Sequence, residues 1–242
     1  MTISVAITGA TGRMGRLIQQ IIDDEPALEL HAALSSESDL DEMLGADVLI
    51  DVTRIEVSER VVAFALEHGI DAVVGTSGWS SERLDALRDA VPDGRAALVV
   101  PNFSLGSVLG THLATVAARF YESIEILEAH HDQKVDSPSG TAVRTAEAIS
   151  AARDGAIHAP NAQQEARGQL VAGIPVHALR LRGVVADQQV VFGGVGETLT
   201  IRHETFSDDA YREGIRLALT SVGELTGLTV GLDSLLGIGD AP

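Results

Sequence analysis

Three glycines near the start of the chain limit how it can fold. Gly9, Gly12 and Gly15 follow the apolar run Ile3–Thr8 and open a stretch, Arg13–Asp23, whose apolar residues repeat with helical spacing. In such a strand–turn–helix unit the first glycine allows a tight turn, the second lets a pyrophosphate approach the backbone, and the third allows close helix packing. The phosphates would bind the N–H groups at the positive end of the helix. The spacing predicts dinucleotide binding, and the alternative is a turn with a structural role alone.

Short apolar runs alternate with helical patterns through the first hundred residues. This alternation is typical of βαβ units and a parallel sheet. Further strands are expected in the runs Leu28–Ala33, Val48–Asp51, Ala72–Val74 and Ala97–Val100. The first part of the chain is therefore predicted to be a Rossmann-like, doubly wound α/β domain.

The pattern changes after about residue 105. A helix, a strand at Ser123–Ala129 and a second helix precede a predicted long loop at residues 154–175. Antiparallel strands are then expected at His177–Arg182, Val184–Phe192 and Glu197–His203. These elements predict a second α+β domain with a mixed, largely antiparallel sheet. We assign residues 1–104 and 213–242 to a dinucleotide-binding domain, and residues 105–212 to a domain for substrate binding and oligomerisation.

The charge balance excludes several classes of partner. Lys and Arg total 17 against 35 Asp and Glu, a formal net charge of -18. Such a field repels nucleic acid and acidic membrane surfaces, so an anionic ligand needs local donors. The chain has no cysteine, which excludes disulfides, thiolate nucleophiles and cysteine zinc sites. No signal peptide or long apolar run is evident, and a cytoplasmic, soluble protein is expected.

The residue 20 positions after Gly15, near the end of the second predicted strand, bears on the choice of cofactor. An acidic residue there would bond the ribose of NAD, but this chain has Ser35. A serine tolerates the 2′-phosphate of NADPH, and Arg13 could pair with that phosphate. NADPH is therefore favoured over NADH. Glu37 keeps NADH open, because a small shift of register would bring its carboxylate to the ribose.

Two further loops are candidates for the nicotinamide end. Gly75-Thr76-Ser77-Gly78 and Pro101-Asn102-Phe103-Ser104 follow the fourth and fifth predicted strands. Open α/β sheets bind ligands at the carboxyl ends of their strands. Ordinary turn chemistry is the alternative for both loops.

The densest group of reactive side chains lies in residues 128–142. His130 and His131 are adjacent, and Lys134 is the only lysine in the chain. Histidine is a plausible proton donor near neutral pH, and a lysine ammonium can hold a carboxylate or help protonate. Ser139 can cap the following helix, whose free N–H groups suit a carboxylate. The spacing does not fit metal ligands, so no metal is expected, while a solvated polar loop remains the alternative.

Four stretches together resemble the dihydrodipicolinate reductases, and the resemblance spans the chain in order and length. They are Gly-Ala-Thr-Gly-Arg-Met-Gly (9–15), Gly-Thr-Ser-Gly (75–78), Pro-Asn-Phe-Ser (101–104) and Glu-Ala-His-His-Asp-Gln-Lys-Val-Asp-Ser-Pro-Ser-Gly-Thr-Ala (128–142). The resemblance implies reduction of 4-hydroxy-tetrahydrodipicolinate, through its dehydrated unsaturated imine, to tetrahydrodipicolinate in diaminopimelate and lysine biosynthesis. It also implies NADPH or NADH as hydride donor, and a homotetramer built through the C-terminal sheet.

The resemblance assigns roles to individual residues. His130 matches the catalytic acid–base residue and Lys134 the second proton donor. The substrate contacts implied by the motif, together with the helix cap, are His131, Lys134, Ser139, Gly140 and Thr141. The implied cofactor contacts are Gly9, Ala10, Thr11, Gly12, Arg13, Met14, Gly75, Thr76, Ser77, Val100, Pro101, Asn102 and Phe103, with Ser35 in place of the usual acid.

Other functions and weaker candidates complete the sequence predictions. A short-chain oxidoreductase would need a Tyr-x-x-x-Lys pair, and neither Tyr121 nor Tyr211 has one. A non-catalytic dinucleotide sensor stays open, although it leaves the His-His-Lys segment without a purpose. Arg180 and Arg182 are expected on a solvated strand face or at an oligomer interface.

Overall fold

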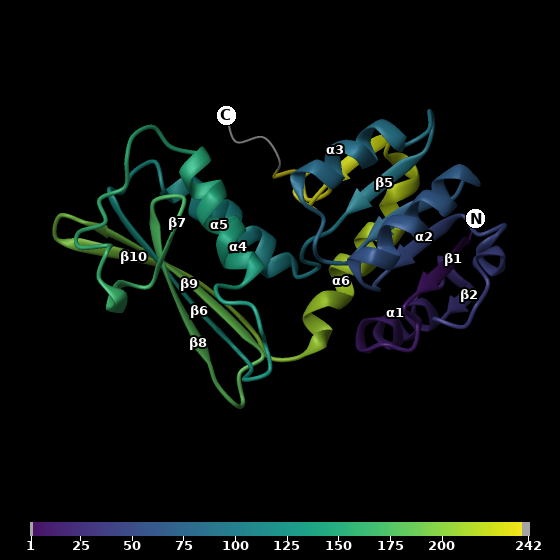
Figure 1. Cartoon of the computed structure of the whole chain (residues 1–242), viewed down its shortest axis with the longest axis horizontal. Coiled ribbons are helices and arrows are strands. Elements are labelled where there is room, and N and C mark those ends of the chain that lie inside the picture. Colours follow the sequence, from purple (N-terminus) through teal and green to yellow (C-terminus); the bar gives the residue numbers. More distant parts are fainter. Residues whose placement is uncertain (1, 239–242) are drawn as a thin grey trace. The chain divides into compact units, whose positions relative to one another are not determined.

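The computed structural model describes residues 2–238, and the chain divides into two compact units (Figure 1). Of the described residues, one unit contains those up to Leu105 and those from Tyr211 to Ile238, and the other contains Gly106–Ala210. Within the described residues, no helix has the length and apolar character that a membrane span requires.

The first unit is built on six parallel strands in the order β11-β5-β4-β3-β1-β2. Their bounds are Ile3–Thr8 (β1), Leu28–Leu34 (β2), Val48–Asp51 (β3), Asp71–Val74 (β4), Ala96–Val99 (β5) and Gly227–Val230 (β11). The strand order reverses at β1, with β2 on one side and β3 on the other. Open α/β sheets bind ligands at the carboxyl ends of their strands beside such a reversal. The predicted Rossmann-like sheet is confirmed.

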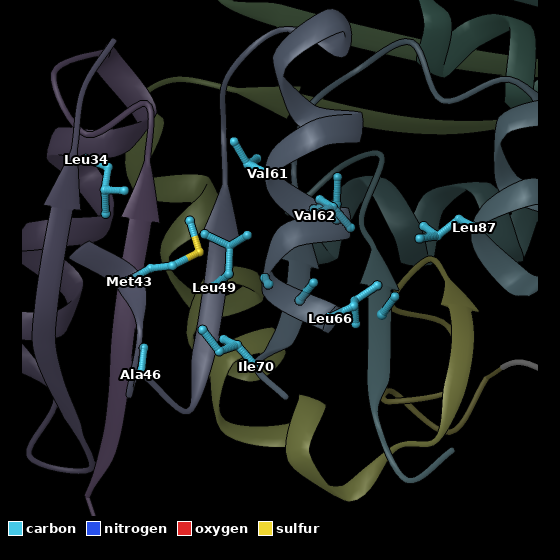
Figure 2. Close-up of a cluster of buried hydrophobic side chains, with 14 of the residues drawn as sticks. Leu34, Met43, Ala46, Leu49, Val61, Val62, Leu66, Ile70 and Leu87 are labelled. Carbon is cyan, nitrogen blue, oxygen red and sulfur yellow. The ribbon is translucent and has the colours of Figure 1, made fainter. Parts of the chain in front are cut away.

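Helices and a core of aliphatic side chains cover this sheet. The helices are α1 (Arg13–Asp24), α2 (Ile55–Glu67), α3 (Ser81–Ala90) and α6 (Arg212–Ser221), with 3-10 turns η1 (Leu40–Met43) and η4 (Val222–Glu224). In Figure 2, Leu49 of β3 lies among buried side chains that include Val62 and Leu66 of α2. Each strand from β3 to β5 is four residues long and almost wholly buried. Their continuous apolar runs follow from burial on both faces of a parallel sheet.

The second unit has a five-stranded sheet in the order β10-β9-β6-β8-β7. Its strands are β6 (Ser123–His130), β7 (Gln169–Val171), β8 (Ile174–Arg180), β9 (Ala186–Gly194) and β10 (Glu197–Thr205). Only the pairing of β6 with β8 is parallel among these described strands. The sheet packs against α4 (Leu105–Ala117) and α5 (Gly140–Ala151) through a core that includes Ile126, Ala146 and Phe192. The predicted mixed, largely antiparallel sheet is also confirmed.

Two details of the sequence prediction are wrong. The predicted loop at residues 154–175 contains the 3-10 turn η2 (Glu165–Arg167), the strand β7 and the start of β8. Ala172 and Gly173 form the two-residue turn between β7 and β8, and both have positive φ (48° and 87°), as a type I′ hairpin requires. No strand is predicted after the last helix, yet β11 pairs with β5. Four residues at a sheet edge carry too short a pattern to be recognised.

Candidate active site

The glycine turn after β1 has the geometry that its spacing predicts. Gly9 has a φ of +81°, and its carbonyl accepts a hydrogen bond from the Gly12 N–H at 3.0 Å. A Cβ at Gly15 would lie 2.3 Å from the Gly9 oxygen, so only glycine lets α1 start this close to the turn. The helix begins after Gly12 with no side chain capping it. Its first N–H groups therefore lack the side-chain acceptor that would compete with a phosphate.

The turn lies beside the end of β2. The Ala10 N–H donates to the Leu34 carbonyl at 3.1 Å, and Ser35 is the first residue after that strand. Ser35 is half-buried, and its hydroxyl accepts a hydrogen bond from the Glu37 N–H at 3.2 Å. Glu37 is exposed and lies three residues beyond the end of the strand. Ser35, and not Glu37, is therefore the residue that directly follows the strand beside the glycine turn.

A buried carboxylate that the sequence prediction missed connects the neighbouring strand ends. Asp51, the last residue of β3, is fully buried. It accepts hydrogen bonds from the hydroxyls of Thr8 (2.8 Å), Thr53 (2.6 Å) and Thr76 (2.6 Å). Its carbonyl also accepts the N–H of Gly75 at 2.8 Å. Asp51 therefore joins the end of β1 to the loop after β4.

The candidate loops after β4 and β5 contact each other. Val100 N–H donates to the Val74 carbonyl at 2.8 Å, and the Phe103 ring packs so closely on Gly75 that a Cβ there would lie 2.6 Å from it. The Asn102 side chain accepts the Ser104 N–H at 2.9 Å, which holds the second loop in a turn. Thr76 and Phe103 are buried, so these loops are packed in place.

The second unit presents a different buried carboxylate, Glu128, beside His130. Glu128 Oε2 lies 2.7 Å from His130 Nδ1 and accepts from Arg180 at 2.9 Å. Its Oε1 accepts from Arg180 and from the Ser139 N–H, each at 3.0 Å. The Glu128 side chain is completely buried. Since an ionised carboxylate only accepts, His130 Nδ1 carries the proton of this bond and Nε2 is the ring atom left for chemistry.

Ionisation of Glu128 follows from its donors. Burial raises the pKa of the Glu128 carboxyl, but the hydrogen bonds from His130, Arg180 and the Ser139 N–H outweigh burial, and the pKa lies below its ordinary value. Arg180 is therefore not the solvated or interface residue that its strand pattern predicts. It faces inward, because its neighbour His130 in the parallel pair β6–β8 lies on the same side of the sheet as Glu128. Arg182 does point to solvent, where it pairs with Asp132 at 3.0 Å.

The loop from β6 to α5 carries the other predicted substrate residues. The strand ends at His130, so His131 starts the turn and is exposed. Ser139 is buried and caps α5 by accepting the Ala142 N–H at 3.2 Å. Lys134 Nζ lies 2.8 Å from Asp136 Oδ1. Gly140, the first residue of α5, has open space around its Cα, and Thr141 is half-buried beside it.

Replacing Glu128 by glutamine tests how much this cluster stabilises the fold. The variant leaves the Arg180 guanidinium without its carboxylate, and we expect a loss of about 3 kcal/mol of unfolding free energy at pH 7. Because the folded-state pKa of Glu128 is depressed, its contribution is present above the unfolded-state pKa of roughly 4.3 and disappears as the pH falls through the folded-state value. The difference between wild type and variant should therefore shrink in acid, as urea unfolding from pH 3 to pH 7 would measure.

Glu125 is a matched control on the same strand. It also binds one arginine and one histidine, Arg167 and His177, but it lies on the opposite face of the sheet with its side chain 30% exposed. Glu125→Gln should cost less than about 1 kcal/mol. Equal losses for the two variants would contradict the special role of Glu128.

Comparisons with known proteins agree on one family. A family model described as "Dihydrodipicolinate reductase, N-terminus" matches residues 3–103, and one described as "Dihydrodipicolinate reductase, C-terminus" matches residues 106–236. The 4-hydroxy-tetrahydrodipicolinate reductase of Clavibacter sepedonicus is 54% identical over 240 residues, which cover 98% of this chain and 87% of the relative. The enzyme of the same name from Cutibacterium acnes is 46% identical over 244 residues, covering 98% and 99%.

A solved structure supports the same assignment. Dihydrodipicolinate reductase from Paenisporosarcina sp. TG-14, bound to dipicolinate, is 30% identical and superposes with a TM-score of 0.83, covering 97% of this chain and 99% of that one. The chain therefore belongs to the dihydrodipicolinate reductase family, the nicotinamide-dependent oxidoreductases that reduce 4-hydroxy-tetrahydrodipicolinate in diaminopimelate and lysine biosynthesis.

Proposed function

We propose that His130 is the proton donor of this reduction and that Lys134 and the start of α5 hold a carboxylate of the substrate. The observation that carries the proposal is the bond from His130 Nδ1 to the buried Glu128, 2.7 Å long, which leaves Nε2 for the substrate. Lys134 and Gly140 follow His130 on one short loop. A proton donor and an anion-binding group on one loop suit a substrate that is both reduced and negatively charged.

The chemistry requires a proton as well as a hydride. When bound, the nicotinamide cofactor supplies the hydride to the unsaturated imine. The imine carries an electron pair away from the carbon that is attacked, and a second atom of the conjugated system must take a proton. His130 Nε2 donates that proton, and Glu128 stabilises the ring through Nδ1 while it is charged. Lys134 stands as a second proton donor, and its ammonium offsets the negative charge of the substrate.

Four residues of the second unit are proposed to bind the dicarboxylate. Dipicolinate, bound in the related structure, is a planar ring with two carboxylates. One carboxylate would be held by the Lys134 ammonium and the N–H groups of Gly140 and Thr141, since a helix N-terminus favours an anion. His131, exposed after the end of β6, would contact the substrate from the same loop. Ser139 acts through its cap, because its hydroxyl and N–H both bind within the protein.

The first unit is proposed to hold the cofactor. The absent side chains at Gly9, Gly12 and Gly15 make the cradle that a pyrophosphate needs, and a Cβ at Gly12 would lie 3.3 Å from the Gly9 oxygen. The N–H groups of the turn and first helical turn would bind the phosphates. These residues are Gly9, Ala10, Thr11, Gly12, Arg13 and Met14. The loops that would face the nicotinamide are Gly75–Ser77 and residues 100–103.

NADPH is the preferred cofactor in this proposal. Ser35 occupies the position after β2 where a carboxylate would repel a 2′-phosphate, and Arg13 is exposed at the start of α1. The serine hydroxyl and the guanidinium can both donate to that phosphate. Glu37 lies further along the chain and binds the serine hydroxyl only through its own N–H.

A homotetramer built through the second sheet completes the proposal. The residues of β6 alternate, with Ile124, Ile126 and Glu128 buried and the intervening positions half-buried. Leu179 of β8 pairs with Ala129 and so lies on that second face, where its side chain is 43% exposed. A sheet face with exposed apolar side chains suits association with another copy.

Substitution of His130 tests the chemical role. His130→Gln should lower kcat at least a hundredfold while the KM for NADPH stays unchanged, because glutamine cannot donate a proton. His131→Gln is the matched control, with a raised substrate KM and a kcat within a few-fold of wild type. The assay follows NADPH oxidation while a synthase forms the unstable substrate from pyruvate and aspartate semialdehyde. Equal losses of kcat would overturn the assignment, and absence of synthase-dependent oxidation by the wild type would favour a dinucleotide sensor.

Substitution of Ser35 tests the cofactor preference. Ser35→Asp places a carboxylate beside the 2′-phosphate, and we expect kcat/KM for NADPH to fall about tenfold while the value for NADH holds or rises. Glu37→Gln should change kcat/KM for NADPH and kcat/KM for NADH by no more than about twofold. If Glu37→Gln lowers the use of NADH and Ser35→Asp changes nothing, then Glu37 is the ribose ligand and the preference for NADPH fails.

Sedimentation equilibrium tests the assembly. The wild type should have four times the 25.4 kDa mass of one chain. Leu179→Glu should dissociate the tetramer, since a charge replaces an apolar contact. Leu30→Glu is the control, because Leu30 is 41% exposed on β2 of the first unit. A monomeric wild type, or a tetramer that survives Leu179→Glu unchanged, would contradict the proposed interface.

A further inference from the structure

Asp136 occupies an anion site formed by its own chain. Its Oδ1 lies 2.8 Å from Lys134 Nζ, and the backbone N–H of Gly140 helps to lower the pKa of its carboxyl. Burial raises the pKa of Asp136, but the Lys134 ammonium and the backbone N–H groups outweigh burial and hold the pKa below its ordinary value. A carboxylate therefore fills this position at neutral pH.

The Lys134 ammonium that binds Asp136, and the Gly140 N–H that lowers its pKa, are among the groups proposed for the substrate. A lysine ammonium and the first N–H of α5 make a site suited to one carboxylate. A substrate carboxylate on Lys134 and the first N–H groups of α5 would lie beside the Asp136 carboxylate, which already binds Lys134, and two carboxylates in one site repel each other. Binding of a dicarboxylate therefore favours movement of the Asp136 side chain away from Lys134.

The surroundings of Asp136 allow it to move. Its side chain is 56% exposed, whereas the Lys134 side chain is 22% exposed. The neighbouring Val135 is fully exposed. The backbone carbonyl of Asp136 accepts a hydrogen bond from Arg180, so the movement required is one of the Asp136 side chain and not of the loop backbone. Exposed ion pairs contribute little to stability, which keeps the exchange of one carboxylate for another inexpensive.

We propose that Asp136 is an internal competitor that holds the substrate's carboxylate position until the dicarboxylate displaces it. This inference rests on the proposed binding of a substrate carboxylate by Lys134 and the start of α5. The apparent affinity for the ligand equals its intrinsic affinity multiplied by the fraction of molecules in which Asp136 has left the site. Small anions that offer one carboxylate replace only what Asp136 already supplies, whereas a dicarboxylate adds further contacts.

Binding of dipicolinate by calorimetry tests the proposal. Asp136→Asn removes the competing charge, and dipicolinate should bind about two- to fivefold more tightly than to the wild type. Asp136→Ala, which also removes the side-chain oxygens, should bind at least as tightly as Asp136→Asn. A variant that merely damaged the loop would bind more weakly, so the direction of the change separates competition from a structural role.

Asp132→Asn is the matched control. Asp132 belongs to the same loop and its removal changes the net charge equally, but its partner is Arg182 rather than Lys134. Its affinity for dipicolinate should equal that of the wild type. An equal gain for Asp132→Asn would assign the effect to long-range charge and overturn the proposal, as would unchanged or weaker binding by Asp136→Asn.

The proposed function can fail separately in the same experiment. If Lys134→Ala binds dipicolinate as well as the wild type does, then the carboxylate site itself is misplaced and Asp136 has nothing to compete with. Binding of NADPH, followed by its fluorescence, should be the same in all five proteins. A variant that has lost NADPH binding has lost its fold and is left out of the comparison. Because two variants, Asn and Ala, are made at position 136, the loss of one still leaves the other as an independent reading of the competition.

Discussion

Burial of a carboxylate at the end of a strand organises both units. An ionised carboxylate removed from water is very costly unless donors surround it, so the chain around it must supply those donors in fixed positions. Asp51 ends β3 and Glu128 lies two residues before the end of β6, and both are buried. Each carboxylate thereby fixes the side chains and loops that lie around it, and these are the candidate cofactor loops in one unit and the candidate catalytic histidine in the other.

Different donors stabilise the two buried carboxylates. Asp51 receives three threonine hydroxyls, which connect β1, β3 and the loop after β4. Glu128 receives an arginine, a histidine and a backbone N–H. The donors to the Asp51 side chain are hydroxyls, so this network contains no positive side chain on Asp51 among the described residues. The arginine of the second site allows Glu128 to stay ionised next to the histidine proposed as the proton donor.

Much of this arrangement could be predicted from the sequence because its signals are local. The glycine turn, the buried four-residue strands and the cap of α5 by Ser139 each depend on residues within a few positions of one another. The pairing of Glu128 with Arg180 joins residues 52 apart, and that of Asp51 with Thr8 joins residues 43 apart. Alternation along a strand places Arg180 on a face, but only the register of β6 against β8 shows that this face carries a buried acid. A charged residue at the end of an otherwise apolar strand, as in Val48–Asp51, was the one local signal for the missed network.

The most direct test of this account is a crystal structure of the chain with NADPH and dipicolinate. We expect one carboxylate of dipicolinate on Lys134 and the N–H groups that start α5, with His130 Nε2 facing the ring and its Nδ1 still bound to Glu128. The cofactor phosphates should lie on the N–H groups of the glycine turn. Dipicolinate bound away from the loop between His130 and Thr141, or a His130 ring turned from Glu128, would contradict the account.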